Sequence, residues 1–190
     1  MQPSGCLEFL SSWRPAARWT RAELPEALRA WLLDPASLTQ RIICACRGVF
    51  RVRVLSQSWC RPFLSEAKVL GLGAGRRALV RQVQLLCDED PWVYARTIIP
   101  AATLTGRERR LARLRSRSLG AVLFSDPTMT RGETEIARLA PGNPLFALAT
   151  RGLEVRSSAI WGRRAVFRLT EKPLLVTEVF LPGIGSFPVR

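Results

Sequence analysis

The sequence predicts an α+β fold, with a single antiparallel sheet of about six strands and helices packed on one face of it. Three observations lead to this fold class. Alternating apolar residues predict several strands, short turns join adjacent strands, and helical spacing appears before and between them. Short turns indicate antiparallel pairing, because parallel strands need long crossover connections. With 190 residues the chain is long enough for one domain with a hydrophobic core.

The chain begins with a predicted loose arm over residues 1–20, and a single domain is expected over residues 21–190. The first predicted helix lies where apolar residues from Leu24 to Leu32 recur at helical spacing, and Pro35 ends it. The segment PASLTQRIICAC, which follows, predicts a second short helix.

The period then changes from helix to strand. In VFRVRVL three apolar residues alternate with two arginines, which predicts a half-buried strand. The clearest unit is a hairpin of residues 78–87 and 92–99, because an acidic turn containing Pro91 separates two β-rich runs.

The second half of the chain mixes the two periods. Residues 103–124 follow a helical pattern, with leucines on one side and arginines on the other. The segment MTRGETEIARL fits strand or helix, and residues 141–144 form a loop rich in Pro and Gly. A second hairpin is predicted from residues 161–169 and 172–182, around a turn at 170–173.

The charge of the chain is strongly positive. Its formal net charge is +14, and 27 of the 29 basic residues are arginines. The densest cluster, RERRLARLRSR at 107–117, fits a solvated helix face, and nucleic-acid binding is the competing interpretation. Because the other arginines are spread along the chain, we expect no nucleic-acid partner. A positive field can also steer a small dianion toward a site.

Cysteine and histidine usage excludes several kinds of chemistry. Five cysteines are too few for a disulfide scaffold, which favours a reducing cytoplasm. Cys44 and Cys46 form a C-x-C pair that could provide two ligands of a zinc site. The chain has neither a second cysteine pair nor a His to complete such a site, so we expect no metal. The same absence excludes His-based triads. No apolar run in the sequence is long enough to predict a signal peptide or a membrane-spanning segment.

Two charged residues lie on strand faces that are otherwise apolar. In KPLLVTEVFLP, alternation places Glu178 on one face with Leu174, Val176 and Phe180, and the other face is apolar too. In RRALVRQVQLLC, Arg81 interrupts an apolar face in the same way. Such charges need partners, because an unpaired buried charge is very unfavourable. Either they form a structural ion pair or lie at frayed edges, or they sit at opposite ends of a cavity that a ligand completes.

Four segments, LLCDEDPWVYARTIIP, SLGAVLF, IWGRRAVFRL and KPLLVTEVFLP, occur in an order and spacing that resembles the chorismate pyruvate-lyase family. The resemblance covers most of the chain. It implies an antiparallel sheet, helical flaps over an internal ligand cavity, and no cofactor. It also implies that chorismate is the substrate and that 4-hydroxybenzoate and pyruvate are the products, at the start of ubiquinone biosynthesis.

The resemblance also implies roles for four residues. Arg81 matches the arginine that binds the ring carboxylate, and Glu178 matches the glutamate that meets the hydroxyl end of the ligand and helps in catalysis. Leu119 corresponds to a leucine near a flap, and Leu38 stands where the best-known member has a methionine. A second cation is expected for the pyruvyl carboxylate. The candidates are Arg96, Arg163 and Arg164.

A second function class remains open beside the enzyme. The same fold type can serve as an effector domain that binds a small aromatic acid without turning it over, because a fold does not determine a function. For either function we expect a monomer that binds small molecules.

Overall fold

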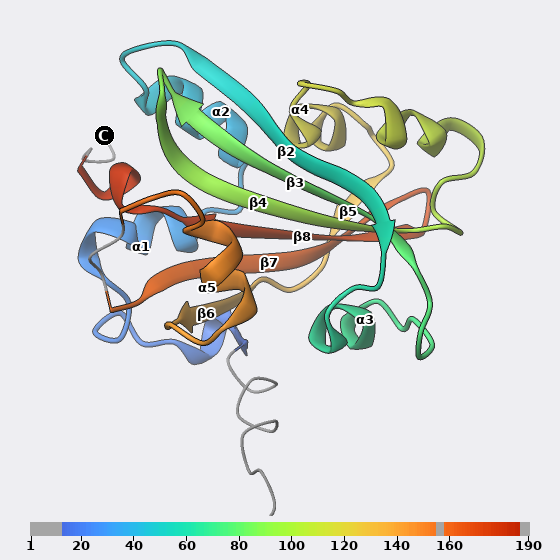
Figure 1. Ribbon diagram of the computed structural model, residues 1–190, viewed down its shortest axis with the longest axis horizontal. Coiled ribbons are helices and arrows are strands. Elements are labelled where there is room, and N and C mark those ends of the chain that lie inside the picture. The colour runs from blue at the N-terminus through green and yellow to red at the C-terminus, as the bar shows by residue number, and fades with distance from the viewer. Residues whose placement is uncertain (1–12, 155–157, 187–190) are drawn as a thin grey trace, which may run out of the picture.

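The computed structural model describes residues 13–154 and 158–186, which form one antiparallel sheet flanked by helices (Figure 1). The sheet has eight strands, of which seven follow the order β1-β6-β7-β8-β4-β3-β2, and the eighth, β5, pairs with β7 outside this path. The strands are β1 (Arg14–Pro15), β2 (Phe50–Cys60), β3 (Ala78–Cys87), β4 (Asp90–Pro100), β5 (Met129–Arg131), β6 (Glu135–Leu139), β7 (Ile160–Leu169) and β8 (Lys172–Phe180). The predicted fold class is confirmed, with more strands than about six, because β1 and β5 are too short to show a period.

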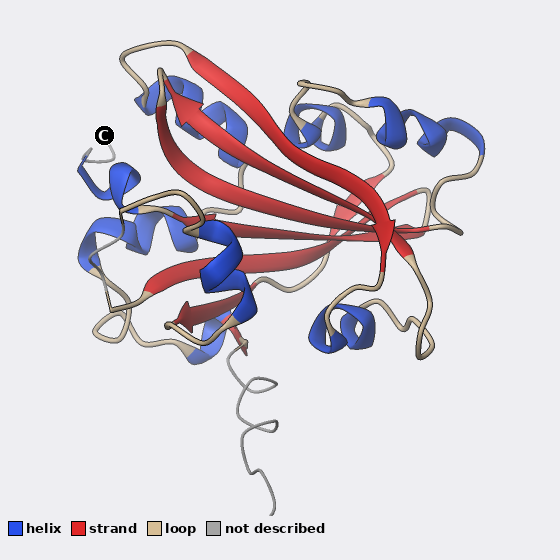
Figure 2. Cartoon of the chain, in the orientation of Figure 1, coloured by secondary structure: helices blue, strands red, loops and turns tan. Residues whose placement is uncertain are grey.

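Short helices surround this sheet (Figure 2). They are η3 (Ala16–Arg18), α1 (Glu26–Leu32), α2 (Leu38–Ala45), α3 (Leu64–Val69), η4 (Gly106–Arg113), α4 (Leu119–Phe124), α5 (Pro144–Ala149) and η5 (Pro182–Ser186). The helical pattern over 103–124 becomes a 3-10 helix, η4, followed by α4. Both predicted hairpins form, as β3–β4 and β7–β8.

Helices cover both faces of the sheet, which corrects the prediction of one covered face. Leu38 and Ile42 of α2 share a buried cluster with Val83 of β3, and we call this side the α2 face. Leu145 of α5 shares another buried cluster with Tyr94 of β4 on the opposite side, the α5 face. Both faces of a strand must be apolar when both are covered. This explains why the sequence of β8 is apolar on both sides.

The predicted N-terminal arm lies partly outside the described residues. Residues 1–12 are outside them, so an arm there stays a prediction. Residues 13–20 contribute β1, which pairs with β6 through Arg14 opposite Ile136. The ring of Trp19 meets that of Trp161 at a centroid distance of 5.2 Å. Residues 13–20 therefore pack against the sheet in the described part of the chain.

A buried ion pair fastens α3 to the α5 face of the sheet. Arg96 Nε donates to Glu66 Oε1 at 2.7 Å and Arg96 Nη2 donates to Glu66 Oε2 at 3.1 Å. Both side chains are almost fully buried. Glu66 also accepts from the Phe63 N–H at 2.8 Å. Such a bidentate pair is stable in an apolar environment only while both partners are present.

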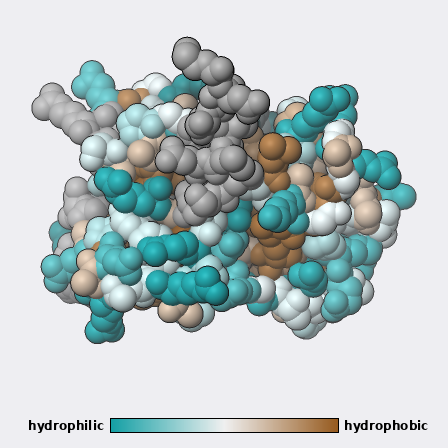
Figure 3. All heavy atoms as spheres, turned by 90° about the horizontal axis from the view of Figure 1, so that it is seen from below, coloured by the Kyte–Doolittle hydropathy of each residue, from teal (hydrophilic) through white to brown (hydrophobic). Residues whose placement is uncertain are grey.

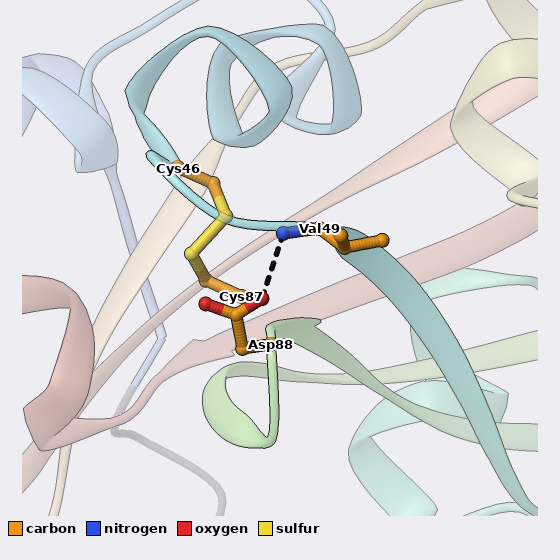
Figure 4. The surroundings of a disulfide bond; sticks show 4 residues. All are labelled: Cys46, Val49, Cys87 and Asp88. Atoms are coloured by element: carbon orange, nitrogen blue, oxygen red, sulfur yellow. Dashed lines mark hydrogen bonds between the residues drawn. A yellow bond between two sulfur atoms is a disulfide. The ribbon is translucent and has the colours of Figure 1, made fainter.

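A disulfide connects the end of α2 to the end of β3 (Figure 4). Cys46 and Cys87 are bonded, with a Cα–Cα distance of 5.6 Å. Beside them Val49 N–H donates to the Asp88 carboxylate at 2.8 Å. Of the other cysteines that the structure describes, Cys44 and Cys60 are free thiols. The five cysteines predicted no disulfide scaffold, and this single bond is a local tether between α2 and the β3–β4 hairpin.

On the face of the protein that Figure 3 shows, much of the described surface is hydrophilic. Figure 3 shows one face, on which an area of hydrophobic residues is surrounded by hydrophilic ones. The most exposed large apolar side chain among the described residues is Leu64 of α3, at 75%. None of the helices in the described ranges is long and apolar enough to cross a bilayer.

Replacing Glu66 by Gln should destabilise the protein by about 3–5 kcal/mol, because it leaves the Arg96 charge buried and unpaired. Urea denaturation of the wild type and the variant measures this difference. The matched control is Glu89→Gln, because Glu89 pairs with Arg51 and Arg53 at an exposed site, where such pairs are worth about 0–1 kcal/mol. Equal losses in the two variants would contradict the structural role of the buried pair.

Candidate active site

An internal pocket lies on the α2 face of the sheet, beneath α2 and α4. We call it the inner pocket. Its free space is about 50 Å³. All four residues predicted as ligand contacts line it, and they come from four different elements. They are Leu38 of α2, Arg81 of β3, Leu119 of α4 and Glu178 of β8. Apolar side chains complete the walls, among them Val83, Phe167 and Val176.

Arg81 lies at one end of this group, on the apolar face of β3 that alternation predicted. It is only 3% exposed. Its Nη1 donates to Gln57 Oε1 at 3.1 Å, and its Nη2 donates to the backbone carbonyls of Arg115 at 2.6 Å and Arg117 at 3.3 Å. Among the described residues no carboxylate pairs with it. Burial lowers the pKa of the Arg81 guanidinium, but arginine still keeps its proton at neutral pH.

Glu178 finds its partner in Arg163, not in Arg81. The two residues lie directly opposite each other in the β7–β8 ladder. Arg163 Nε donates to Glu178 Oε2 at 2.6 Å, and the side chain of Glu178 is 19% exposed. Two strands separate β3 from β7, with β8 and β4 between them. The inner pocket therefore has an arginine without a carboxylate partner on β3 and a paired carboxylate on β8.

Arg163 also connects the sheet to the end of α1 and to the loop between α1 and α2. Its Nη1 donates to the carbonyls of Trp31 at 2.7 Å and Asp34 at 2.6 Å. Arg131 supports the same loop by donating to the Pro35 carbonyl at 2.8 Å. Burial and the neighbouring Arg163 charge lower the pKa of Arg131. The carboxylate of Glu178 is thus held by a group that also positions the cover of the pocket.

The three arginines proposed as a second cation do not share one place. Arg96 and Arg164 point to the α5 face, where they pair with Glu66 and Glu135. Only Arg163 lies on the pocket side, and it is engaged by Glu178. Sequence reasoning missed Arg117, which lines the inner pocket. Arg117 belongs to the arginine cluster at 107–117, so the sequence marked it only as one charge among several.

The two helices that cover the inner pocket touch each other. Thr39 Oγ1 of α2 lies 2.7 Å from the hydroxyl of Ser118, the N-cap of α4, so the two groups share a hydrogen bond. Gly120 is packed so closely against Thr39 that an added Cβ would lie 2.8 Å from its Oγ1. This contact closes the pocket where α2 and α4 meet.

The remaining candidates for acid–base or metal chemistry lie elsewhere. Tyr94 is fully buried on the α5 face and donates to Gln82. Burial raises the pKa of Tyr94 to about 12, so it stays neutral near pH 7. Within residues 13–154 and 158–186, no three His, Cys, Asp or Glu side chains come together as metal ligands. The charged side chains that line the inner pocket are therefore those of two arginines and one glutamate, beside the hydroxyl groups of Thr39, Thr97 and Ser118.

Comparison of the sequence with known proteins identifies a family for this chain. The family described as Chorismate lyase matches residues 11–186 of the chain. A probable chorismate pyruvate-lyase of Azoarcus sp. is 46% identical over 165 residues, which cover 85% of this chain and 87% of that protein. Another probable chorismate pyruvate-lyase, of Methylococcus capsulatus, is 40% identical over 161 residues, which cover 85% of this chain and 98% of that protein.

Solved structures with a similar fold are more distant in sequence. PhnF from Mycobacterium smegmatis has a TM-score of 0.56 at 17% identity, over 80% of this chain and 66% of that chain. The C-terminal domain of the histidine utilization repressor from Pseudomonas syringae has a TM-score of 0.55 at 11% identity, over 71% of this chain and 93% of that chain. At these identities the likeness concerns the fold alone. The family match and the curated relatives extend over most of the sequence, and the chain belongs to the chorismate lyase family.

Proposed function

We propose that this chain is a chorismate pyruvate-lyase, which converts chorismate to 4-hydroxybenzoate and pyruvate without a cofactor, at the first step of ubiquinone biosynthesis. The observation that carries the proposal is the inner pocket, which presents Arg81 without a carboxylate partner and Glu178 on the same sheet face. Membership of the chorismate lyase family supports the same reaction. The cytoplasmic location and the monomeric state expected from the sequence belong to this proposal, and gel filtration tests the latter.

The chemistry of the substrate needs little covalent help from the protein. Chorismate carries a ring carboxylate, a ring hydroxyl opposite to it, and an enolpyruvyl ether with its own carboxylate. The ether C–O bond breaks, the hydrogen on the hydroxyl-bearing ring carbon leaves, and the enolpyruvyl fragment gains a hydrogen to become pyruvate. The ring becomes aromatic, which provides the driving force. Holding the reactive conformer in place accelerates such a reaction greatly.

Arg81 and Glu178 match the two polar ends of the flat product. In our proposal Arg81 receives the ring carboxylate, because a guanidinium offers a planar fork to two carboxylate oxygens. Glu178 accepts a hydrogen bond from the ring hydroxyl. It also helps to move the hydrogen that leaves the hydroxyl-bearing ring carbon. Arg163 orients this carboxylate from the opposite strand. Leu38 and Leu119 contact the ring from the covering helices.

The enolpyruvyl carboxylate requires a second cation. Arg96 and Arg164 lie on the α5 face, so they do not reach the inner pocket. Arg163 is already paired with Glu178. We propose Arg117 for this role, because it lines the inner pocket and takes part in no ion pair within the described ranges.

Entry of the substrate requires the covering helices to move. Small-molecule sites usually enclose roughly 300–1,000 Å³, whereas the free space of the inner pocket is about 50 Å³. The cover is held by the Thr39–Ser118 hydrogen bond and by the carbonyls bound to Arg81. Separation of α2 from α4 is therefore part of the proposed cycle, and it makes product release slow.

Incubating the purified protein with chorismate and no added metal tests the proposal directly. We expect pyruvate and 4-hydroxybenzoate in equal amounts, detected by a coupled assay and by ultraviolet absorbance. Added 4-hydroxybenzoate should slow the reaction. If the protein binds 4-hydroxybenzoate but produces no pyruvate, it is a binding domain of the effector type and not a lyase.

Replacing Arg81 by Ala should raise KM for chorismate at least about tenfold, because a charge-assisted hydrogen bond is worth about 1.5–3 kcal/mol. Steady-state kinetics measures this change. The control is Gln57→Leu, which removes a hydrogen-bond partner of Arg81 but leaves the guanidinium charge in place. We expect a change of less than about threefold in the control. Comparable effects in the two variants would remove Arg81 from the ligand site.

Replacing Glu178 by Gln should slow turnover by roughly tenfold or more, because the carboxylate that handles the proton is lost. It should also destabilise the protein by about 3–5 kcal/mol, because Arg163 is left unpaired. The double variant Glu178→Gln with Arg163→Gln removes both charges, and it should recover part of the stability while turnover stays low. Recovery of turnover together with stability would mean that Glu178 has a structural role only.

A further inference from the structure

The disulfide of the protein is attached to a helix that covers the inner pocket. Cys46 is the C-cap of α2, and Cys87 is the last residue of β3, the strand that carries Arg81. The first turn of α2 lines the inner pocket through Leu38 and Thr39. A covalent bond at the C-terminal end of α2 therefore restrains a wall that must move when a ligand enters or leaves.

The turn that follows Cys46 has its own noncovalent contacts with the β3–β4 hairpin. Val49 N–H donates to Asp88 Oδ1 at 2.8 Å, and Asp88 N–H donates to the Val49 carbonyl at 2.9 Å (Figure 4). Gly48 lies so close to Asp88 that an added Cβ would be 1.9 Å from Oδ2. These contacts keep β2 in register with β3 without the disulfide. What the disulfide adds is a restraint on α2 itself.

The other end of α2 is held by hydrogen bonds. Arg163 Nη1 donates to the Asp34 carbonyl in the preceding loop at 2.6 Å, and Thr39 Oγ1 lies 2.7 Å from the Ser118 hydroxyl. With the disulfide intact, both ends of α2 are held. After reduction, packing in the buried cluster that contains Ile42 is what keeps the C-terminal end in place.

Thiol–disulfide exchange with a small thiol opens such a bond. Cys46 is half-buried, whereas Cys87 is only 8% exposed, so the attacking thiolate reaches the sulfur of Cys46 and Cys87 leaves as a thiolate. A second small thiol then attacks the mixed disulfide and releases Cys46. Two small thiols become one disulfide, and the two cysteines gain two electrons and two protons. Arg47, which is exposed beside Cys46, attracts an anionic thiol such as glutathione.

We propose that Cys46 and Cys87 form a reversible redox switch, which responds to a small thiol–disulfide couple such as glutathione and controls how freely α2 opens. In the cytoplasmic location proposed above, disulfides are usually transient and often serve as redox sensors. The effect on turnover rests on the lyase function proposed above. In the oxidised form α2 stays closed and the product leaves slowly, so oxidation lowers turnover.

Equilibration in glutathione buffers tests whether the bond is reversible, with alkylation and mass spectrometry to measure the free thiols. Cys46 and Cys87 should be oxidised together in oxidised glutathione and reduced together in an excess of reduced glutathione. The control is Cys44→Ser, which removes an exposed thiol of the same helix and should leave this transition unchanged. A bond that never forms, or that excess reduced glutathione never opens, would overturn the switch.

Hydrogen exchange of the full chain measures the motion of α2 without any ligand. Amides of α2 should exchange about threefold faster or more in the reduced form than in the oxidised form, while those of α5 on the opposite face stay unchanged. Under oxidising conditions Cys46→Ser and Cys87→Ser should both behave like the reduced wild type, and Cys44→Ser should behave like the oxidised one. Equal exchange of α2 in both forms would contradict the proposal.

Kinetics with chorismate separate the switch from the lyase function. Reduction should raise kcat by about threefold or more, and should speed the dissociation of 4-hydroxybenzoate by a similar factor. Redox-dependent exchange of α2 without any turnover would support the switch and refute the lyase. Turnover at equal rates in the two forms would overturn the switch and leave the lyase assignment intact.

Discussion

Arg81 is a permanently charged side chain on an apolar sheet face, and the inner pocket is organised around meeting its need for hydrogen bonds. Gln57 and the carbonyls of Arg115 and Arg117 supply these bonds without supplying a negative charge. A buried cation satisfied only by neutral acceptors keeps a strong attraction for an anion. The same bonds draw the segment before α4 over the pocket. One residue therefore provides both the proposed ligand anchor and part of the closure.

The opposite end of the pocket is arranged differently. Glu178 pairs with Arg163, and Arg163 in turn donates to the carbonyls of Trp31 in α1 and of Asp34 in the loop before α2. The covering helices are thus joined to the sheet through both charged ends of the site. The Cys46–Cys87 disulfide holds the far end of α2. Between the two covering helices, Thr39 and Ser118 share a hydrogen bond.

Sequence periodicity was sufficient to place Arg81 and Glu178 on apolar strand faces, because side chains alternate strictly along a strand. It was also sufficient for both hairpins. The partner of Glu178 was within reach of the same reasoning. A two-residue turn at Thr170 and Glu171 pairs Leu169 with Lys172, and counting back along both strands brings Arg163 opposite Glu178.

Other features depend on contacts between distant segments, which periodicity does not encode. The covering of both sheet faces depends on where α3 and α5 pack, and strands as short as β1 and β5 show no period. Arg117 carried only the general signal of a charge cluster. The Cys46–Cys87 bond joins residues 41 positions apart, and no local pattern distinguishes these cysteines from the free Cys44. The predicted ligand contacts of Leu38 and Leu119 came from the family resemblance and not from single-residue patterns, and they stay predictions.

Calorimetric binding of ligand pairs tests most directly whether Arg81 and Glu178 hold the two ends of one ring acid. The ligands are 4-hydroxybenzoate, its uncharged amide, and benzoate, which lacks the hydroxyl. The account predicts that the amide binds the wild type at least about tenfold more weakly than the acid, and that this penalty disappears when Arg81 is replaced by Gln. The penalty for losing the hydroxyl should persist in that variant. An undiminished preference for the carboxylate in the Arg81 variant would contradict the account.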